Sequence, residues 1–188
     1  MVKNDVGSSR TRTDSRGSRR LRKLLTGGDR RSIAGANEAL ALVHANAELV
    51  SELATLVEDN DWLVSERALD VLEKLAHERP DWVAPFKNVF IGEVADSDKW
   101  EIRLQVVRAL PLFGWSTAAR RRAVAILCRD VGHSQTFVKA WALDSLARFA
   151  EQQRDLIPVV RHWLVRFENS ESKALIARAR HIRARLSI

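Results

Sequence analysis

The segment FVKAWALDSLARFA, residues 137–150, carries the side chains best suited to hold a partner molecule. Its apolar residues recur at helical spacing and predict a helix with one buried face. Trp141 lies off that face, close to Asp144 and Arg148. An exposed indole ring is a frequent anchor in protein interfaces, and the arginine fork binds carboxylates and phosphates. The alternative interpretation is that Trp141 packs against the helix expected at residues 172–186.

Residue patterns typical of catalysis or metal binding are weak in the rest of the chain. Cys128 lies near the buried face of its expected helix with no histidine nearby, which disfavours a role as nucleophile. The glycines of LLTGGDRRS, residues 24–32, lack the spacing of a phosphate-binding P-loop. The five histidines show neither HExxH nor metal-ligand spacing: His44, His77, His133, His162 and His181. We therefore expect a protein that is not an enzyme, with no catalytic residue, no metal and no cofactor.

The composition is that of one soluble globular domain, with 188 residues of which 46% are hydrophobic and 29% charged. A single cysteine cannot form an internal disulfide, so we expect a reducing compartment, the cytoplasm. No apolar run approaches the ~18 residues of a membrane span, and no apolar stretch follows the basic N-terminus as in a secretory signal. The sequence therefore predicts no contact with a membrane.

Charge is distributed unevenly along the chain. The net charge is +7 for residues 1–31, −10 for residues 32–98 and +10 for residues 99–188. Such asymmetry concerns the choice of partners rather than the fold.

The sequence predicts a basic tail at the N-terminus. Residues 1–23 are rich in Ser, Thr and Arg and almost free of apolar side chains, so we expect disorder, with a hinge at residues 24–28. The expected division is thus a tail and hinge at residues 1–28 and a folded domain at residues 29–188. The tail residues that can contact nucleic acid or an acidic partner are Arg10, Arg12, Arg16, Arg19, Arg20, Arg22 and Lys23. Two alternatives for the tail are a purely solubilising role and pairing with the acidic residues 32–98.

Three segments of the remaining chain align without gaps. They are residues 64–76, 102–114 and 138–150, which begin 38 and 36 residues apart. A fixed period of this length indicates stacked helical repeats. Partner helices are expected between them, at residues 81–95, 116–130 and 155–168, with a shorter copy at residues 32–43 and an arginine-rich copy at residues 172–186.

The pattern D-x-x-x-V-R-x-x-A-x-x-x-L resembles the HEAT repeat. It appears as DKWEIRLQVVRAL (98–110) and, less completely, as QTFVKAWALDSL (135–146), with Arg103 and Lys139 at the family's basic position and Ser65 departing from it. The resemblance implies an all-α fold, a short right-handed α-solenoid of about four to five helical hairpins. In that family the second helices line a concave surface that binds protein or nucleic acid.

A weaker similarity points to the AlkD-type DNA alkylation-repair branch of HEAT-like proteins. Members hold damaged DNA with Trp, Asp and Arg side chains on the concave face. Trp141, Asp144, Arg103 and Arg148 are of those types but do not match the family's set position by position.

The favoured interpretation is a non-catalytic binding or scaffold module that recognises a protein partner through its concave face. The predicted contact residues are Arg103, Arg108, Lys139, Trp141, Asp144, Arg148, Arg180 and Arg183. Further concave positions are Ser65, Glu66, Asp70, Glu73, Lys74, Gln105, Ser145, Arg178 and Arg185. DNA or RNA binding, with or without base-repair activity, is the alternative function, and a solvated face with local ion pairs is the alternative to a binding surface.

Overall fold

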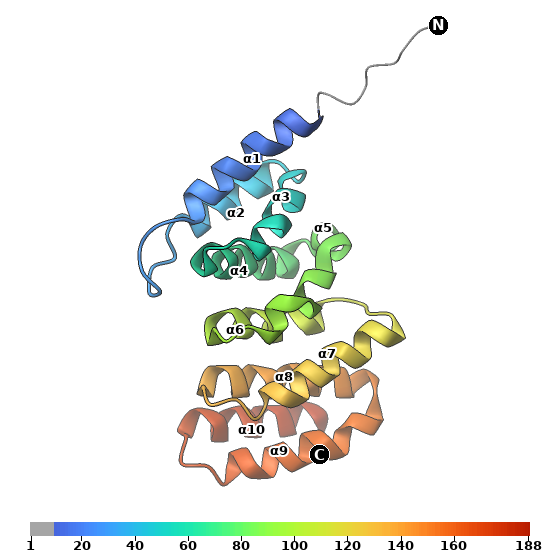
Figure 1. Cartoon of the computed structure of the whole chain (residues 1–188). Coiled ribbons are helices and arrows are strands. Elements are labelled where there is room, and N and C mark those ends of the chain that lie inside the picture. The colour runs from blue at the N-terminus through green and yellow to red at the C-terminus, as the bar shows by residue number, and fades with distance from the viewer. Residues whose placement is uncertain (1–9) are drawn as a thin grey trace, which may run out of the picture. The chain divides into compact units, whose positions relative to one another are not determined.

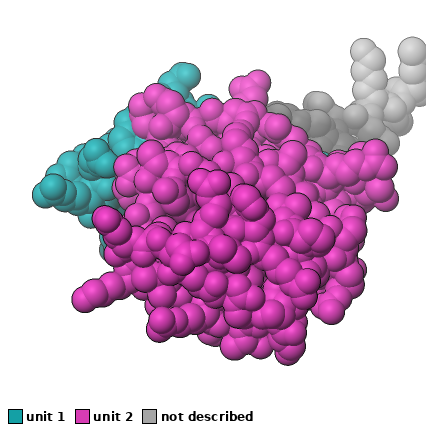
Figure 2. All heavy atoms as spheres, turned by 90° about the horizontal axis from the view of Figure 1, so that it is seen from below, with its two compact units in different colours: residues 1–89 teal, residues 90–188 magenta. Residues whose placement is uncertain are grey.

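The fold is an all-α solenoid, seen in a computed structural model that describes residues 10–188, with side chains from residue 17 onward (Figure 1). No strand occurs in this part of the chain. The chain divides into two compact units, residues 1–89 (unit 1) and residues 90–188 (unit 2), which Figure 2 colours separately. Across the described residues, no helix combines the length and the apolar character that a membrane crossing needs.

Unit 1 is built around α4. Its elements are α1 (Arg10–Leu25), α2 (Ala36–Ala45), α3 (Leu49–Thr55), the 3₁₀ turn η1 (Leu56–Glu58), α4 (Trp62–Glu78), α5 (Pro80–Val83) and most of η2 (Ala84–Ile91). The side chain of Asp61 caps α4 by accepting a hydrogen bond from the Leu63 N–H. Helices α1, α2 and α3 all pack against α4, so the core of unit 1 forms along that helix.

Unit 2 contains a row of three helices that lie side by side in the order α6, α8, α10. Its elements are η3 (Glu93–Asp96), α6 (Trp100–Ala109), η4 (Leu110–Leu112), α7 (Thr117–Asp130), α8 (Thr136–Gln152), η5 (Arg154–Leu156), α9 (Ile157–Glu168) and α10 (Lys173–Leu186). Helix α7 packs on α8, and α9 packs on α8 and α10. Ser116 and Ser172 cap α7 and α10.

The repeat alignment predicts correctly which apolar residues of each helix are buried. Its three segments fall in α4, in α6 with η4, and in α8, and the matched residues Val64, Ile102 and Val138 are all buried. The partner helix expected at residues 81–95 differs from the prediction, because the chain there forms α5, η2 and η3 instead. Gly92 has an extended backbone that separates η2 from η3.

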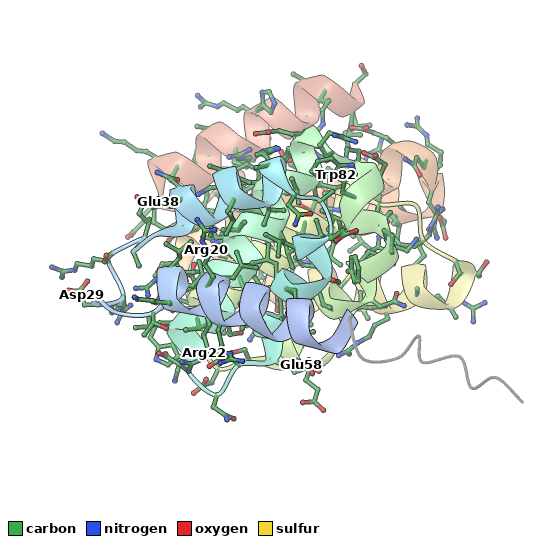
Figure 3. All side chains as sticks on the ribbon, turned by 90° about the horizontal axis from the view of Figure 1, so that it is seen from above. Arg20, Arg22, Asp29, Glu38, Glu58 and Trp82 are labelled. Atoms are coloured by element: carbon green, nitrogen blue, oxygen red, sulfur yellow. The ribbon has the colours of Figure 1, made fainter. Side chains whose placement is uncertain are left out.

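The expectation of disorder is wrong for the described part of the N-terminal region. Residues 10–25 form α1, in which Leu21 and Leu25 are fully buried. Arg22 forms a bidentate ion pair with Asp59, at 2.6 and 3.1 Å, and Figure 3 labels Arg20 and Arg22 on this helix. Two leucines one helical turn apart are enough to dock α1 once α3 and α4 supply the apolar surface. The prediction for residues 1–9 lies outside the described residues.

A glycine pair ends α1 and begins the loop to α2. Gly27 and Gly28 have φ of +91° and +69°, and a Cβ on Gly28 would lie 2.8 Å from Ser32. We expect Gly28→Ala to lower the free energy of unfolding of unit 1 by about 1–2 kcal/mol, because alanine is strained at positive φ. Gly114→Ala is the control, since a Cβ there meets no atom within 4 Å. Chemical denaturation of both variants gives the comparison, and equal stabilities would contradict this account of the loop.

Candidate protein-interaction site

Trp141 is flanked by two arginines from the helices on either side of it. The ring lies on α8, with the Arg108 guanidinium of α6 at 5.4 Å and the Arg178 guanidinium of α10 at 4.6 Å from its centroid. Trp141 is half-buried, so part of the indole remains open to a partner. Guanidinium groups at these distances from an aromatic face are attracted to it. We call Arg108, Trp141 and Arg178 the tryptophan–arginine row.

Asp144 lies one turn after Trp141 on α8 and forms ion pairs with three arginines. Its carboxylate accepts hydrogen bonds from Arg148 Nε at 3.2 Å, Arg178 Nη1 at 3.3 Å and Arg185 Nη1 at 3.2 Å. Arg185 also donates to the Asp144 carbonyl at 3.1 Å and lies 2.9 Å from Glu151. We call Asp144 and its three arginines the aspartate cluster.

The burial of Asp144 differs from the prediction of an exposed contact. Its residue exposure is 1%, and its carboxylate faces α10 rather than solvent. The arginines cover it because a buried carboxylate is stable only when it is paired and hydrogen-bonded. Asp144 therefore holds Arg148, Arg178 and Arg185 in place, while Arg148, 44% exposed at its side chain, faces outward.

A cleft of about 390 Å³ opens beside the aspartate cluster at the C-terminal end of α8. It is lined by Pro111, Phe113, Arg120, Arg148, Phe149, Glu151, Gln152 and Arg185. Sequence reasoning missed Arg120 and Glu151, because they lie on α7 and on the last turn of α8, outside the matched positions. Their proximity to Arg185 depends on how α7, α8 and α10 pack.

The other predicted contact residues lie apart from the row. Arg103 pairs with Asp130 of α7, which is fully buried and also bound by Arg129. Arg183 is turned toward α9, where it donates to Glu168 at 2.8 and 3.0 Å. Lys139 is half-buried on the first turn of α8, and Arg180 is exposed on α10.

A second cationic group surrounds the loop between α7 and α8. Burial, followed by the charges of Arg103, Arg129 and Lys139, lowers the pKa of His133 in this loop. Both causes disfavour the protonated form of this imidazole.

Asp96 pairs with two arginines of α7, and the stability that this pairing adds depends on pH. Hydrogen bonds from Arg122 and Arg129 lower its pKa. A carboxyl with a depressed folded-state pKa adds stability above its ordinary pKa, about 4, and that stability is lost as pH falls through the folded value. We expect Arg122→Gln to raise the pKa of Asp96, as measured by carbon NMR titration, while Arg121→Gln, which changes an exposed neighbour, leaves it unchanged. An unchanged Asp96 titration in Arg122→Gln would contradict the ion pair.

Several positions expected on an exposed concave face are buried instead: Ser65, Glu73, Gln105 and Ser145. The hydroxyls of Ser65 and Ser145 donate to the carbonyls of Val57 and Val107, both at 2.6 Å. The two serines therefore satisfy backbone carbonyls of other elements, whereas Glu73 contacts His77 and Gln105 accepts from Arg108.

The structure describes the side chains of some of the predicted tail residues but not of all. Arg22 is engaged with Asp59, whereas Arg19, Arg20 and Lys23 are exposed on α1. The side chains of Arg10, Arg12 and Arg16 lie outside the described residues. Among the side chains that are described, no group of three or more His, Cys, Asp and Glu is arranged to hold a metal ion.

Comparison with known proteins identifies the fold. Protein-family models and curated sequences gave no match. Among solved structures, the chain is similar to an engineered protein (19% identity, TM-score 0.64, covering 95% of this chain and 82% of that one). It is also similar to a designed armadillo repeat protein in complex with the peptide (KR)4 (17%, 0.61, 97% and 83%). A third similar structure is of computationally designed armadillo repeat proteins for modular peptide recognition (16%, 0.60, 97% and 83%). These likenesses support an α-solenoid repeat fold.

Proposed function

We propose that this chain is a non-catalytic, cytoplasmic binding module that recognises an acidic segment of a protein partner through the tryptophan–arginine row. The observation that carries the proposal is the half-buried Trp141 ring between guanidinium groups of two neighbouring helices. A rigid aromatic ring surrounded by arginine is the composition typical of interface hot spots.

Charge favours an acidic partner. Unit 2 carries 17 Lys and Arg against 10 Asp and Glu, a net charge of +7. Complementary charge accelerates association and excludes like-charged partners. The similar designed repeat proteins support a peptide-binding use of the fold, and one of them holds a basic peptide, the opposite charge to the one proposed here.

Binding of a labelled acidic peptide tests this function. The probe is Glu-Glu-Phe-Ser-Glu-Glu, with Lys-Lys-Phe-Ser-Lys-Lys as the charge-reversed comparison, followed by fluorescence anisotropy. We expect only the acidic peptide to bind, with affinity that falls as salt rises. Trp141→Ala is expected to weaken binding about tenfold or more, because it removes the central anchor.

Arg161→Gln/Arg166→Gln is the matched control for loss of charge, since both arginines are exposed on α9 and neither contacts the row. This double variant should retain the affinity within about threefold, as expected for charges at a distance. Equal binding of both peptides, or full affinity in Trp141→Ala, would contradict the proposal. Tighter binding of a 12-base-pair DNA duplex than of the acidic peptide would favour the nucleic-acid alternative.

A further inference from the structure

The cleft at the C-terminal end of α8 holds guanidinium donors that bind no other residue in the described part of the chain. Arg120 lines the cleft, and its side chain makes no hydrogen bond or ion pair with another described residue. Arg148 uses only its Nε toward Asp144, which leaves its two terminal nitrogens available. Two arginines thus line one cleft, and their guanidinium forks bind phosphate and carboxylate oxygens through paired hydrogen bonds.

The charge around the cleft matches a dianion. Three guanidinium groups line the cleft, those of Arg120, Arg148 and Arg185, together with one carboxylate, that of Glu151. The local net charge is therefore +2. A phosphorylated side chain carries about −1.5 to −2 at pH 7, whereas a carboxylate carries −1. A phosphate monoester thus balances the cleft more fully than an acidic side chain does.

The accessible lining of the cleft is mostly polar, with a smaller apolar part that is firmly packed. Phe113 and Phe149 belong to that part with Pro111, and Phe113 also stacks on Phe90 at 5.7 Å and meets Trp115 edge-on at 5.8 Å. Such a lining suits a charged group of a peptide more than an apolar side chain. The volume of about 390 Å³ lies within the range of sites that bind small groups.

We infer that this cleft binds a phosphorylated serine or threonine within the acidic segment of the partner. The inference rests on the proposed function, since the same partner would meet the tryptophan–arginine row. Arg120 and Arg148 bind the phosphate oxygens, and Arg185 is held in place by Asp144 and Glu151.

The test compares the acidic peptide with its phosphoserine form on the full chain. We expect the phosphoserine form to bind about tenfold more tightly, because two charge-assisted contacts are added. Arg120→Gln/Arg148→Gln should reduce that ratio to less than about twofold, while Arg161→Gln/Arg166→Gln preserves it. Arg120→Gln alone should also lower the ratio, and it leaves the aspartate cluster intact.

The outcomes separate this inference from the proposed function. Equal affinity of the two peptide forms for the unmodified chain overturns the phosphate cleft and leaves the acidic-segment proposal standing. If only the phosphoserine form binds, and it loses affinity in Arg120→Gln/Arg148→Gln, the cleft stands and the proposed function fails. If neither form binds, both fail. A DNA duplex that binds more tightly than the phosphopeptide, and loses affinity in Arg120→Gln/Arg148→Gln, overturns the assignment to a protein.

Discussion

Replacing Arg67 by methionine is expected to lower the free energy of unfolding of unit 1 by about 3 kcal/mol. Arg67 is 1% exposed, and its guanidinium donates five hydrogen bonds to the backbone carbonyls of the loop after α1. The acceptors are Leu25, Gly27, Asp29 and Ser32, at 2.6–3.2 Å. Methionine keeps the aliphatic length but supplies no donor, so these carbonyls lose their partner. Asp29 marks this loop in Figure 3.

Chemical denaturation combined with amide exchange gives the measurement for Arg67→Met. Exchange in α4 and in the loop should accelerate, and exchange in unit 2 gives an internal reference. Arg31→Met is the control, because Arg31 is exposed in the same loop, and its stability should stay within about 0.5 kcal/mol of the parent. A stable Arg67→Met protein with unchanged exchange would contradict the role assigned to this arginine.

Replacing Asp144 by asparagine is expected to lower the free energy of unfolding of unit 2 by about 2 kcal/mol. Asparagine has nearly the same volume, so the effect isolates the loss of charge. Without the carboxylate, the guanidinium groups of Arg148, Arg178 and Arg185 repel one another with no buried counter-charge. Partial exposure of the three arginines keeps the loss below that of a fully buried pair.

Amide exchange in α8 and α10 provides the readout for Asp144→Asn, because these helices share the aspartate cluster. Asp155→Asn makes the same chemical change at an exposed position of η5 and should leave exchange in both helices unchanged. If the two variants behave alike, the aspartate cluster contributes nothing to the packing of α10 on α8.

The repeating helices were accessible to sequence reasoning because packing fixes their period. Val64, Ile102 and Val138 recur where each helix must bury one face, so the alignment locates α4, α6 and α8. Helix α1 was not accessible, since its few leucines follow a basic, polar stretch and gain their burial from helices later in the chain.

The candidate site was only partly predictable for a related reason. The repeat alignment places Trp141 at the same position as Arg67 and Gln105, which are polar, and Trp141 therefore suggested an exposed position. Arg67 and Gln105 are both buried. The burial and pairing of the Asp144 carboxylate depend on Arg178 and Arg185, which lie 34 and 41 residues further along the chain. Residue type and spacing within one helix carry no information on which side chains a later helix brings to it.

A nitrogen–proton NMR titration with the peptide Glu-Glu-Phe-Ser-Glu-Glu tests the central claim most directly. Binding at the tryptophan–arginine row should shift the Trp141 indole N–H and the side-chain N–H signals of Arg108 and Arg178. The indole signals of Trp62 and Trp82 in unit 1 should stay in place. Saturable shifts centred on unit 1, or binding that leaves the Trp141 indole unchanged, would contradict the account.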